Sequence, residues 1–343
     1  MIFNRSVRPL AGAVLGLALS TGAMAAEVKT IAVLTPEQGT DFGWNQQGIE
    51  GAEAAAEATG KEIIVAQGLG YGNVRPTLRE LAEDGADLII AHASGYTTEA
   101  IEVAKEMNVH VAVGATSEPP LVGMYELAGE KGSFLAGVLA ARMTKTGTIG
   151  IVVSSESPNW NAQSAGFAQG VKSVAPETTL RYAIIGPAAY ADVAGARRVT
   201  ESVIASGADV IFGQGNGSSF GMIQAVETLK TPGGDKVWFI DVIGDKSSID
   251  KGHLLSSVLW DMGPVFTQMV KDIEADTFGT ASYALNLEDG SQRLLKTDHI
   301  PEDVWAELED VKAKIISGEI EVEMVIEPAA TRAMMSETIA SAE

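Results

Sequence analysis

The sequence predicts an α/β protein with two Rossmann-like lobes, each built on a parallel sheet and joined by a hinge. Three observations support this class. Short apolar, β-branched runs alternate with alanine-rich segments of helical period, a pattern typical of parallel sheets covered by helices. Two pairs of segments repeat about 120 residues apart, which indicates equivalent lobes. The 343 residues, 46% hydrophobic and 20% charged, suffice for two packed domains.

The repeated segments occupy matching positions in the two halves. Trp44-Asn45-Gln46-Gln47 is matched by Trp160-Asn161-Ala162-Gln163, 116 residues later. "GADLIIAHASG" (85–95) is matched by "GADVIFGQGNG" (207–217), 122 residues later. In each half the first motif follows the first strand and the second contains a later strand end. Ligands of open α/β sheets bind beyond the carboxyl ends of the strands, so we expect one ligand in a cleft between the lobes.

Residues 1–25 are expected to be a secretory signal peptide. Arg5 and Arg8 precede the apolar run Leu10–Leu19, and Ala23–Ala25 reads Ala-Met-Ala, a cleavage signal. The run is too short to span a bilayer, and the chain has no Cys for a disulfide or a lipid anchor, so we expect a soluble periplasmic protein. Cleavage leaves 22 basic and 45 acidic residues, a net charge of −23, which argues against nucleic acid or an anionic membrane as partner.

The alternating pattern places the elements in order along the chain. Strands are expected over Thr30–Thr35, Glu62–Gln67, Asp87–His92 and His110–Gly114, then over Thr148–Val153, Leu180–Ile185, Asp209–Gly213 and Val237–Val242. Helices are expected over Asn45–Ala58, Val74–Asp84, Thr98–Met107, Phe134–Met143, Ala162–Val174, Val193–Ser206 and Phe220–Leu229.

The remainder of the chain is less regular. After Gly252 we expect a strand, a helix starting near Gly263-Pro264, a hairpin around Asp289-Gly290, and a helix between Pro301 and Gly318. We assign residues 29–125 and 256–284 to lobe 1, 126–255 and 285–328 to lobe 2, and 329–343 to a flexible tail.

The duplicated tetrapeptides suit a flat polar ligand. An aromatic ring at a strand end can stack on such a ligand, which is worth about 1–3 kcal/mol. The amides of Asn45 and Asn161 offer donors and acceptors for the ligand's edge, and Phe42 supplies a further ring beside Trp44. The alternative is that the tryptophans cover the core and the asparagines cap helices. The duplication at matched positions favours the cleft.

Later strand ends supply the other candidates. Gly95, Gly215 and Gly217 allow backbone N–H groups to approach a ligand, or make ordinary turns. A carboxylate at 241 or 245 could accept hydrogen bonds from a ribose or a ring N–H, or could cap a helix or bond across the hinge. The tryptophan at 260 lies in the cleft or the hinge. The candidate ligand contacts are Phe42, Trp44, Asn45, Ser94, Gly95, Tyr96, Trp160, Asn161, Gln214, Asn216, Asp241, Asp245 and Trp260.

An exported serine hydrolase is the alternative function. Gly217–Gly221 fits Gly-x-Ser-x-Gly with Ser219 at its centre, and Asp241 and His253 follow in α/β-hydrolase order. The equivalent turn of the first lobe carries Thr97, so this turn occurs in both lobes and is not specific to a nucleophilic serine. We therefore expect no enzyme. The chain lacks a dinucleotide fingerprint and its four histidines lack metal-ligand spacing, so no cofactor or metal is expected.

The mature chain resembles the basic membrane protein (BMP) family of type I periplasmic binding proteins, the receptors of ABC importers. The most specific stretch is "ELAGEKGSFLAGVLAARMTKTGTIGIV" (126–152), similar to the family's acidic-Gly-aromatic helix and its "MTKTGKVG". "TDFGWNQQGIEG" and "LLSSVLWDMGP" fit the same family. The resemblance implies the two-lobed fold, a purine nucleoside or nucleobase as ligand, and an inner-membrane ABC permease as partner. We expect a monomer.

The resemblance also bears on the ligand. Trp44-Asn45 takes the place of Phe-Asn in the family's nucleoside-binding branch, and Asp245 best matches the carboxylate of its "D-x-D-Q". The branch has an Asp where this chain reads "AVGATSEP" and a Lys where it has Trp260. "DFGW", "SGY" and "WDMGP" are closer to a branch that takes the bare base. We therefore favour a purine-type nucleobase over a nucleoside, with sensing of another small molecule, riboflavin-like or sugar-like, as a further alternative.

Overall fold

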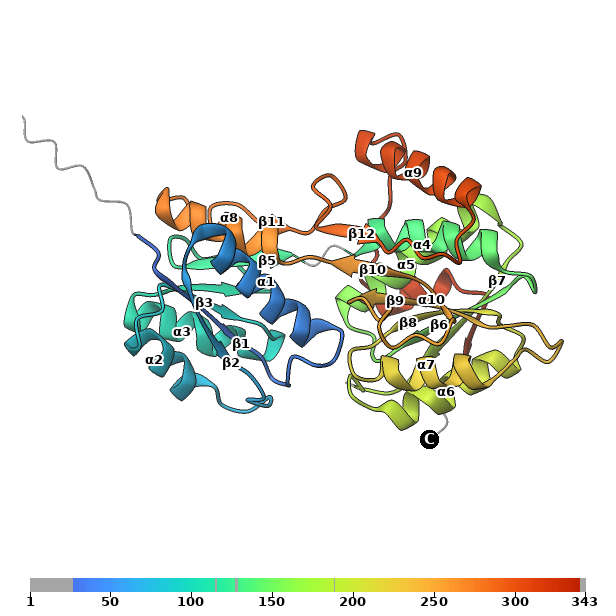
Figure 1. The fold of residues 1–343 in the computed structure, drawn as a ribbon, viewed down its shortest axis with the longest axis horizontal. Coiled ribbons are helices and arrows are strands. Elements are labelled where there is room, and N and C mark those ends of the chain that lie inside the picture. The colour runs from blue at the N-terminus through green and yellow to red at the C-terminus, as the bar shows by residue number, and fades with distance from the viewer. Residues whose placement is uncertain (1–26, 115, 127–128, 188, 340–343) are drawn as a thin grey trace, which may run out of the picture.

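The computed structural model of the chain describes residues 27–114, 116–126, 129–187 and 189–339, and the expected signal peptide lies outside them. Figure 1 shows two lobes side by side, each with a central sheet between helices. The first sheet has six strands in the order β11-β5-β4-β3-β1-β2, and the second has seven in the order β12-β10-β9-β8-β6-β7-β13. The predicted fold class is confirmed.

Strands and helices alternate as the pattern predicts. The strands are β1 (Thr30–Leu34), β2 (Glu62–Ala66), β3 (Leu88–Ala91), β4 (His110–Val113), β5 (Val122–Glu126), β6 (Thr148–Val153), β7 (Thr179–Ile184), β8 (Val210–Gln214), β9 (Trp238–Ile243), β10 (Leu254–Trp260), β11 (Tyr283–Ala284), β12 (Gln292–Leu294) and β13 (Glu337–Ile339). The helices are α1 (Trp44–Thr59), α2 (Arg75–Glu83), the 3-10 turn η1 (Ser94–Tyr96), α3 (Thr97–Met107), α4 (Glu130–Met143), α5 (Pro158–Val174), α6 (Val193–Ala205), α7 (Ser219–Thr228), α8 (Gly263–Glu274), α9 (Glu302–Ser317) and α10 (Pro328–Ala333).

The two lobes share one topology. In the first sheet the strands run β2-β1-β3-β4-β5, and in the second the corresponding order is β7-β6-β8-β9-β10, all parallel within these runs. Trp44 opens the helix after β1, and Trp160 lies in the first turn of the helix after β6. The internal repeat read from the sequence therefore corresponds to equivalent positions in space.

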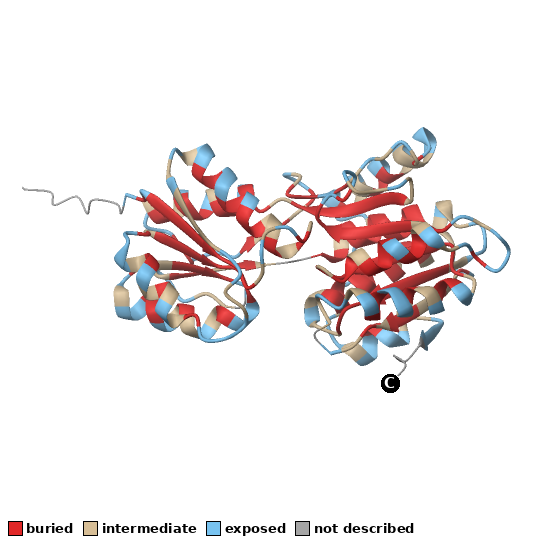
Figure 2. Ribbon diagram, turned by 60° about the horizontal axis from the view of Figure 1, so that its bottom comes forward, coloured by how far each residue is buried: buried red, intermediate tan, exposed pale blue. Residues whose placement is uncertain are grey.

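The sheets are buried on both faces, which explains their continuous apolar runs. β1 (TIAVL) and β3 (LIIA) are buried at every residue. In lobe 1, α1 packs against α8 and α2 packs against α3; in lobe 2, α4 packs against α5 and α9, and α6 packs against α7. Figure 2 shows the buried strands enclosed by helices whose outer faces are exposed. No helix among the described residues is long and apolar enough to cross a membrane.

The chain passes between the lobes three times, and these passages form the hinge. It leaves the first sheet after β5, returns after β10 to form α8, and leaves again after β11 to form β12. Figure 1 shows these strands meeting at the junction of the lobes. The expected boundary at residue 256 falls inside β10, which pairs with β9 and β12, so residues up to 260 belong to the second sheet.

Three local expectations are corrected. No strand was expected over 122–126, because this short segment contains Gly123 and lacks the apolar run of its neighbours. The hairpin around Asp289-Gly290 is wrong: β11 pairs with β5 in lobe 1 and β12 with β10 in lobe 2, so the turn links two sheets. The flexible tail is wrong for 329–339, because α10 forms and β13 pairs with β7.

Candidate functional site

A cleft of about 360 Å³ lies between the lobes. Its walls come from the segments that follow β1, β2, β3 and β4 in lobe 1 and β6, β7 and β8 in lobe 2, with β5 and β9 contributing one residue each. This is the edge of the sheets at which open α/β folds bind ligands. The lining residues are Pro36, Trp44, Tyr71, Ala93, Ser94, Gly114, Tyr125, Ser157, Pro158, Asn159, Trp160, Tyr190, Asn216 and Ile243.

The lining is aromatic and electrically neutral. Trp44, Tyr71 and Tyr125 come from lobe 1, and Trp160 and Tyr190 from lobe 2. The polar members are serine and asparagine side chains, and among the described residues no charged side chain lines the cleft. Aromatic faces with a few amides and hydroxyls suit a flat, uncharged ligand that makes hydrogen bonds at its edge.

Trp44 is held by the loop that precedes α1. The carboxylate of Asp41 accepts hydrogen bonds from the backbone N–H groups of Gly43 (3.1 Å), Asn45 (3.0 Å) and Gln46 (3.0 Å). These are donors at the helix start that have no partner within the helix, so Asp41 fixes the first turn. The indole Nε1 of Trp44 donates to the carbonyl of His92 (2.9 Å), which fixes the ring as well.

Three nearly parallel rings back this wall of the cleft. The Trp44 ring is stacked on the His92 ring at 3.7 Å with an interplanar angle of 12°, and the Tyr125 ring lies beside this pair, 5.9 Å from His92 and 6.4 Å from Trp44. His92 Nε2 lies 2.9 Å from the carbonyl of Trp44, which can only accept, so Nε2 carries the proton and Nδ1 accepts from the Tyr125 hydroxyl at 3.2 Å. His92 covers one face of Trp44, and Trp44 is also part of the cleft lining.

His92 should make stability depend on pH. It is fully buried, and burial lowers its pKa to about 4, from about 6.5 in the unfolded chain. The neutral ring therefore contributes stability that is fully present above pH 6.5 and is lost as pH falls through 4, about 3 kcal/mol in all. We expect the free energy of unfolding from urea titrations to fall between pH 6.5 and 4, and to fall less in His92→Gln.

The comparison of these two proteins isolates His92 from other titrating groups. Burial also lowers the pKa of His110 and raises the pKa of Glu130 and Asp241, but these contributions are common to both proteins. Equal pH slopes for wild type and His92→Gln would show that His92 is not held neutral.

The wall from lobe 2 is built around the start of α5. Ser157 precedes the helix in an extended conformation, and Pro158 at the first helical position presets the turn. Trp160 in this turn is only 4% exposed and packs in the core while lining the cleft. The Tyr190 hydroxyl accepts a hydrogen bond from Ser155 at 3.1 Å, which holds the second aromatic ring of this lobe.

The structure brings four of the sequence-predicted contacts to the cleft: Trp44, Ser94, Trp160 and Asn216. Their contact with a ligand stays a prediction. Asn216 is 7% exposed, and its Oδ1 atom has no hydrogen-bond partner among the described residues. A buried amide oxygen without a partner is costly unless a ligand donates to it.

The other candidates do not line the cleft, and several are engaged within one lobe. Asn45 is fully buried, donating to Asp41 (2.8 Å) and accepting from the N–H of Glu37 (3.3 Å). Asn161 donates to the carbonyl of Ile326 at 2.8 Å. These amides hold neighbouring loops, but neither is the helix cap of the alternative interpretation, because Gly43 and Ser157 occupy the N-cap positions.

The candidate residues at the later strand ends also lie outside the cleft lining. The Tyr96 hydroxyl donates to the carbonyl of Gly70 at 2.5 Å from within the core, and Gln214 donates to Ser164 at 2.6 Å. Asp241 is fully buried and pairs with Lys246, whereas Asp245 is exposed and accepts from the N–H of Ser247. The residues Phe42, Gly95 and Trp260 also lie outside the cleft lining.

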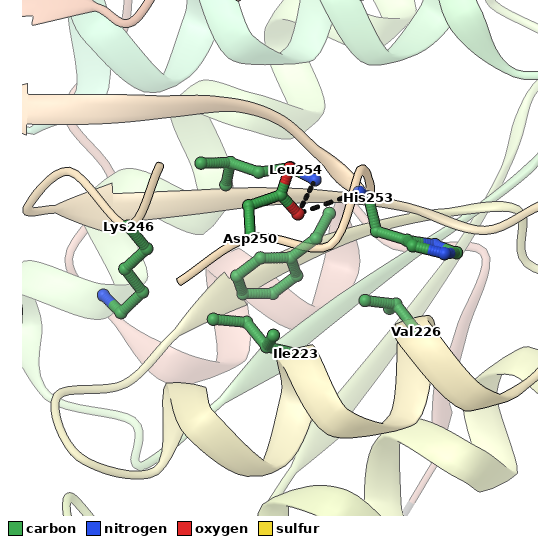
Figure 3. Close-up of a pocket in the computed structure, with 7 residues that line it drawn as sticks. Ile223, Val226, Lys246, Asp250, His253 and Leu254 are labelled. Carbon is green, nitrogen blue, oxygen red and sulfur yellow. Dashed lines mark hydrogen bonds between the residues drawn. The ribbon is translucent and has the colours of Figure 1, made fainter. Parts of the chain in front are cut away.

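The hydrolase alternative fails on geometry. Ser219 donates to Asp241 at 3.1 Å, but Nδ1 of His253 bonds the carbonyl of Val237 at 2.8 Å, at the amino end of β9. Asp241 is four residues further along, which separates the two sites by about 13 Å. Figure 3 shows the ring of His253 directed away from Lys246, at the edge of a pocket that has no room for a water molecule. The triad that the hydrolase alternative requires is not assembled.

Sequence reasoning missed much of the aromatic lining. Tyr71 follows β2 and Tyr190 follows β7, the corresponding strand of the second lobe, and the two lie 119 residues apart. This offset of 119 residues falls between the offsets of the two repeated segments, 116 and 122 residues. The internal repeat therefore contained the information needed to predict both tyrosines. Tyr125 lies in β5, the strand that the pattern did not reveal.

Comparisons with known proteins agree with this architecture. A family model described as "ABC transporter substrate-binding protein PnrA-like" (Bmp) matches residues 28–325. The chain is 27% identical to a "CD4+ T-cell-stimulating antigen" of Listeria innocua, covering 85% of this chain and 87% of that protein. It is 24% identical to a purine-binding protein of Brucella abortus (82% and 79%) and 24% identical to an ABC transporter nucleoside-binding protein of Lactococcus lactis (88% and 91%). A solute-binding protein of Conexibacter woesei has the same fold, with a TM-score of 0.70 at 22% identity, covering 86% and 98%.

Proposed function

The chain belongs to the PnrA-like substrate-binding proteins of ABC transporters, the Bmp family, and on this premise we propose that it captures an uncharged purine-type base between its lobes and delivers it to a permease. The observation that carries the choice of ligand is the lining of the cleft. It combines five aromatic side chains with serine and asparagine groups, and among the described residues it contains no charged side chain.

The chemistry of a purine base matches this lining. Its faces can stack on the Trp44 ring, and such stacking contributes about 1–3 kcal/mol. Its edge carries both donors and acceptors, which amide and hydroxyl groups can satisfy. The unpartnered Oδ1 of Asn216 supplies an acceptor for a ring or amino N–H. Phosphorylated ligands and amino acids would bring charges into a lining that offers no partner for them.

A bare base is favoured over a nucleoside. Ribose hydroxyls are commonly held by carboxylates, but Asp241 is fully buried against Lys246 and Ser219, and Asp245 is exposed outside the cleft. Ile243 occupies the end of β9 in the cleft lining and offers no polar atom beyond its backbone. The relatives named for purine and nucleoside binding support the wider ligand class. A ligand that prefers the closed arrangement would drive closure of the lobes.

A thermal-shift screen tests the proposal. The protein would be melted with adenine, hypoxanthine, guanine, adenosine, cytosine, riboflavin and glucose. A ligand that binds only the native state adds RT ln(1 + [L]/Kd), about 2.7 kcal/mol at one hundred times Kd. We expect purine bases to raise the melting temperature, with adenosine and glucose giving smaller shifts or none. A shift from adenosine but not from adenine would reverse the choice of base over nucleoside, and shifts from glucose or riboflavin alone would reject the ligand class.

A further inference from the structure

The two lobes touch at a second place, beside the cleft but outside its lining. The loop before α1 in lobe 1 meets the end of β9 and the start of α7 in lobe 2. The carbonyl of Phe42 accepts a hydrogen bond from Lys246 Nζ at 2.8 Å, and the Phe42 ring meets the Phe220 ring edge to face at 6.3 Å. We call the set Phe42, Phe220, Gly244 and Lys246 the clasp.

Lys246 is unusual in its burial. Its side chain is 1% exposed and forms an ion pair with the fully buried Asp241, which also accepts from Ser219. Lysines are rarely buried to this degree, and a buried ammonium needs partners for its donors. Asp241 supplies a partner from the same lobe, and the carbonyl of Phe42 supplies one from the other. Figure 3 shows the nitrogen of Lys246 pointing away from Asp250 and His253. Opening of the lobes would cost Lys246 its partner in lobe 1.

The backbone is shaped for this contact on both sides. Phe42 has a φ of 47°, in the left-handed region that residues other than glycine rarely adopt. A Cβ atom on Gly244 would lie 2.1 Å from the carbonyl oxygen of Phe42 and 2.6 Å from its carbonyl carbon. The φ of Gly244 lies outside the left-handed region, so close approach of the two lobes is what requires glycine there.

The clasp and the cleft lining share the loop that precedes α1. Phe42 lies between Asp41, which caps α1, and Trp44, the first residue of that helix. A hydrogen bond from lobe 2 to this loop therefore acts on the segment that positions the Trp44 ring. Since Lys246 does not line the cleft, any effect on binding must pass through this loop.

We infer that the clasp is a closure contact in which Lys246 acts as a positioning residue, holding the Trp44 loop against lobe 2 and thereby prolonging the bound state. The inference rests on the proposed function for its effect on a ligand. The effect of the clasp on the distance between the lobes does not depend on the proposed function, because the clasp joins protein atoms only.

Gly244→Ala tests the clasp without removing any existing group. The added methyl group meets the Phe42 carbonyl only while the lobes are together, so we expect adenine to bind about tenfold more weakly or worse, chiefly through faster dissociation. We expect the melting temperature of the ligand-free protein to stay close to that of the wild type. Ser248→Ala, at an exposed neighbouring position, is the matched control and should bind as the wild type does.

A double variant that removes the Lys246 hydrogen bond and a measurement of the distance between the lobes test the clasp independently of Gly244→Ala. Lys246→Met/Asp241→Asn removes the donor without leaving a buried charge, and it should also dissociate faster. Because the chain has no cysteine, dyes on Glu83→Cys and Arg198→Cys report the distance between the lobes, one label in each. We expect Gly244→Ala to lengthen this distance in the ligand-free protein.

The outcomes separate the two proposals. Wild-type lobe distance and wild-type adenine dissociation in Gly244→Ala would overturn the clasp, whatever the ligand proves to be. A lengthened lobe distance together with no binding of any purine base by the wild type would retain the clasp as a closure contact and reject the proposed function.

Discussion

Replacing Trp44 by alanine is expected to weaken binding of a purine base by about 10- to 100-fold, the equivalent of about 1.4–2.8 kcal/mol. The indole is fixed before the ligand arrives: its Nε1 donates to the carbonyl of His92 and one face is stacked on the His92 ring at 3.7 Å. Little conformational entropy is then lost on binding, so most of the stacking energy appears as affinity. Isothermal titration with adenine measures the change.

The controls for this prediction separate stacking from stability. Trp44→Phe keeps a ring but loses the hydrogen bond to His92, so it should bind between the wild type and Trp44→Ala. Ile316→Ala changes an exposed apolar residue on α9, far from the cleft lining, and should leave affinity unchanged. Unchanged affinity in Trp44→Ala, with the wild type binding adenine, would remove the stacking account of the Trp-Asn-x-Gln motif.

The second large effect is on stability, at the crossing of α4 and α5. A Cβ atom on Gly170 would lie 2.0 Å from the carbonyl oxygen of Phe134, and one on Gly137 would lie 2.1 Å from that of Phe167. The two helices thus meet backbone to backbone, and neither obstructing atom belongs to a movable side chain. We expect Gly170→Ala to lower the free energy of unfolding by about 3 kcal/mol, despite the better helix propensity of alanine.

Urea titration of Gly170→Ala measures this loss, with Gly72→Ala as the matched control. Gly72 has open space where a Cβ would be placed and no left-handed φ, so its replacement should change the free energy of unfolding by less than about 0.5 kcal/mol. Trp160 lies at the start of the same helix, ten residues before Gly170, so a displacement of α5 in Gly170→Ala should weaken adenine binding as well. A Gly170→Ala protein as stable as the wild type would mean that the helices can separate at no cost.

Much of the fold followed from the sequence because the determining interactions are local or periodic. Strands such as β1 and β6 are apolar throughout, and helices such as α9 carry Pro301 before the start and a left-handed Gly318 at the end. The misses were of another kind. β5 contains Gly123 and lacks an apolar run, β13 has three residues and pairs with the distant β7, and the 286–291 turn resembles that of a hairpin although its flanking strands join different sheets.

The position of the site was also predictable, whereas the individual contacts were less so. The repeat placed both Trp-Asn-x-Gln motifs at strand ends facing one cleft, and Trp44 and Trp160 do line it. The asparagine beside each of them had equally good chemistry for a ligand, but Asn45 bonds to Asp41 and Glu37, and the amide N–H of Asn161 donates to the carbonyl of Ile326. Whether a polar group is free depends on partners that are distant in the chain.

The sequence alone therefore determined the alternation of strands and helices, the duplication of the lobes and the edge at which a ligand is expected, because periodicity and internal repeats are properties of the chain itself. The tertiary structure alone decided that Asp241 forms an ion pair with Lys246, that Tyr71 and Tyr190 line the cleft, and that Phe42 contacts the other lobe. These depend on which atoms approach across the sheet ends, and a buried charge or amide bonds to the nearest partner in space, wherever that partner lies in the chain.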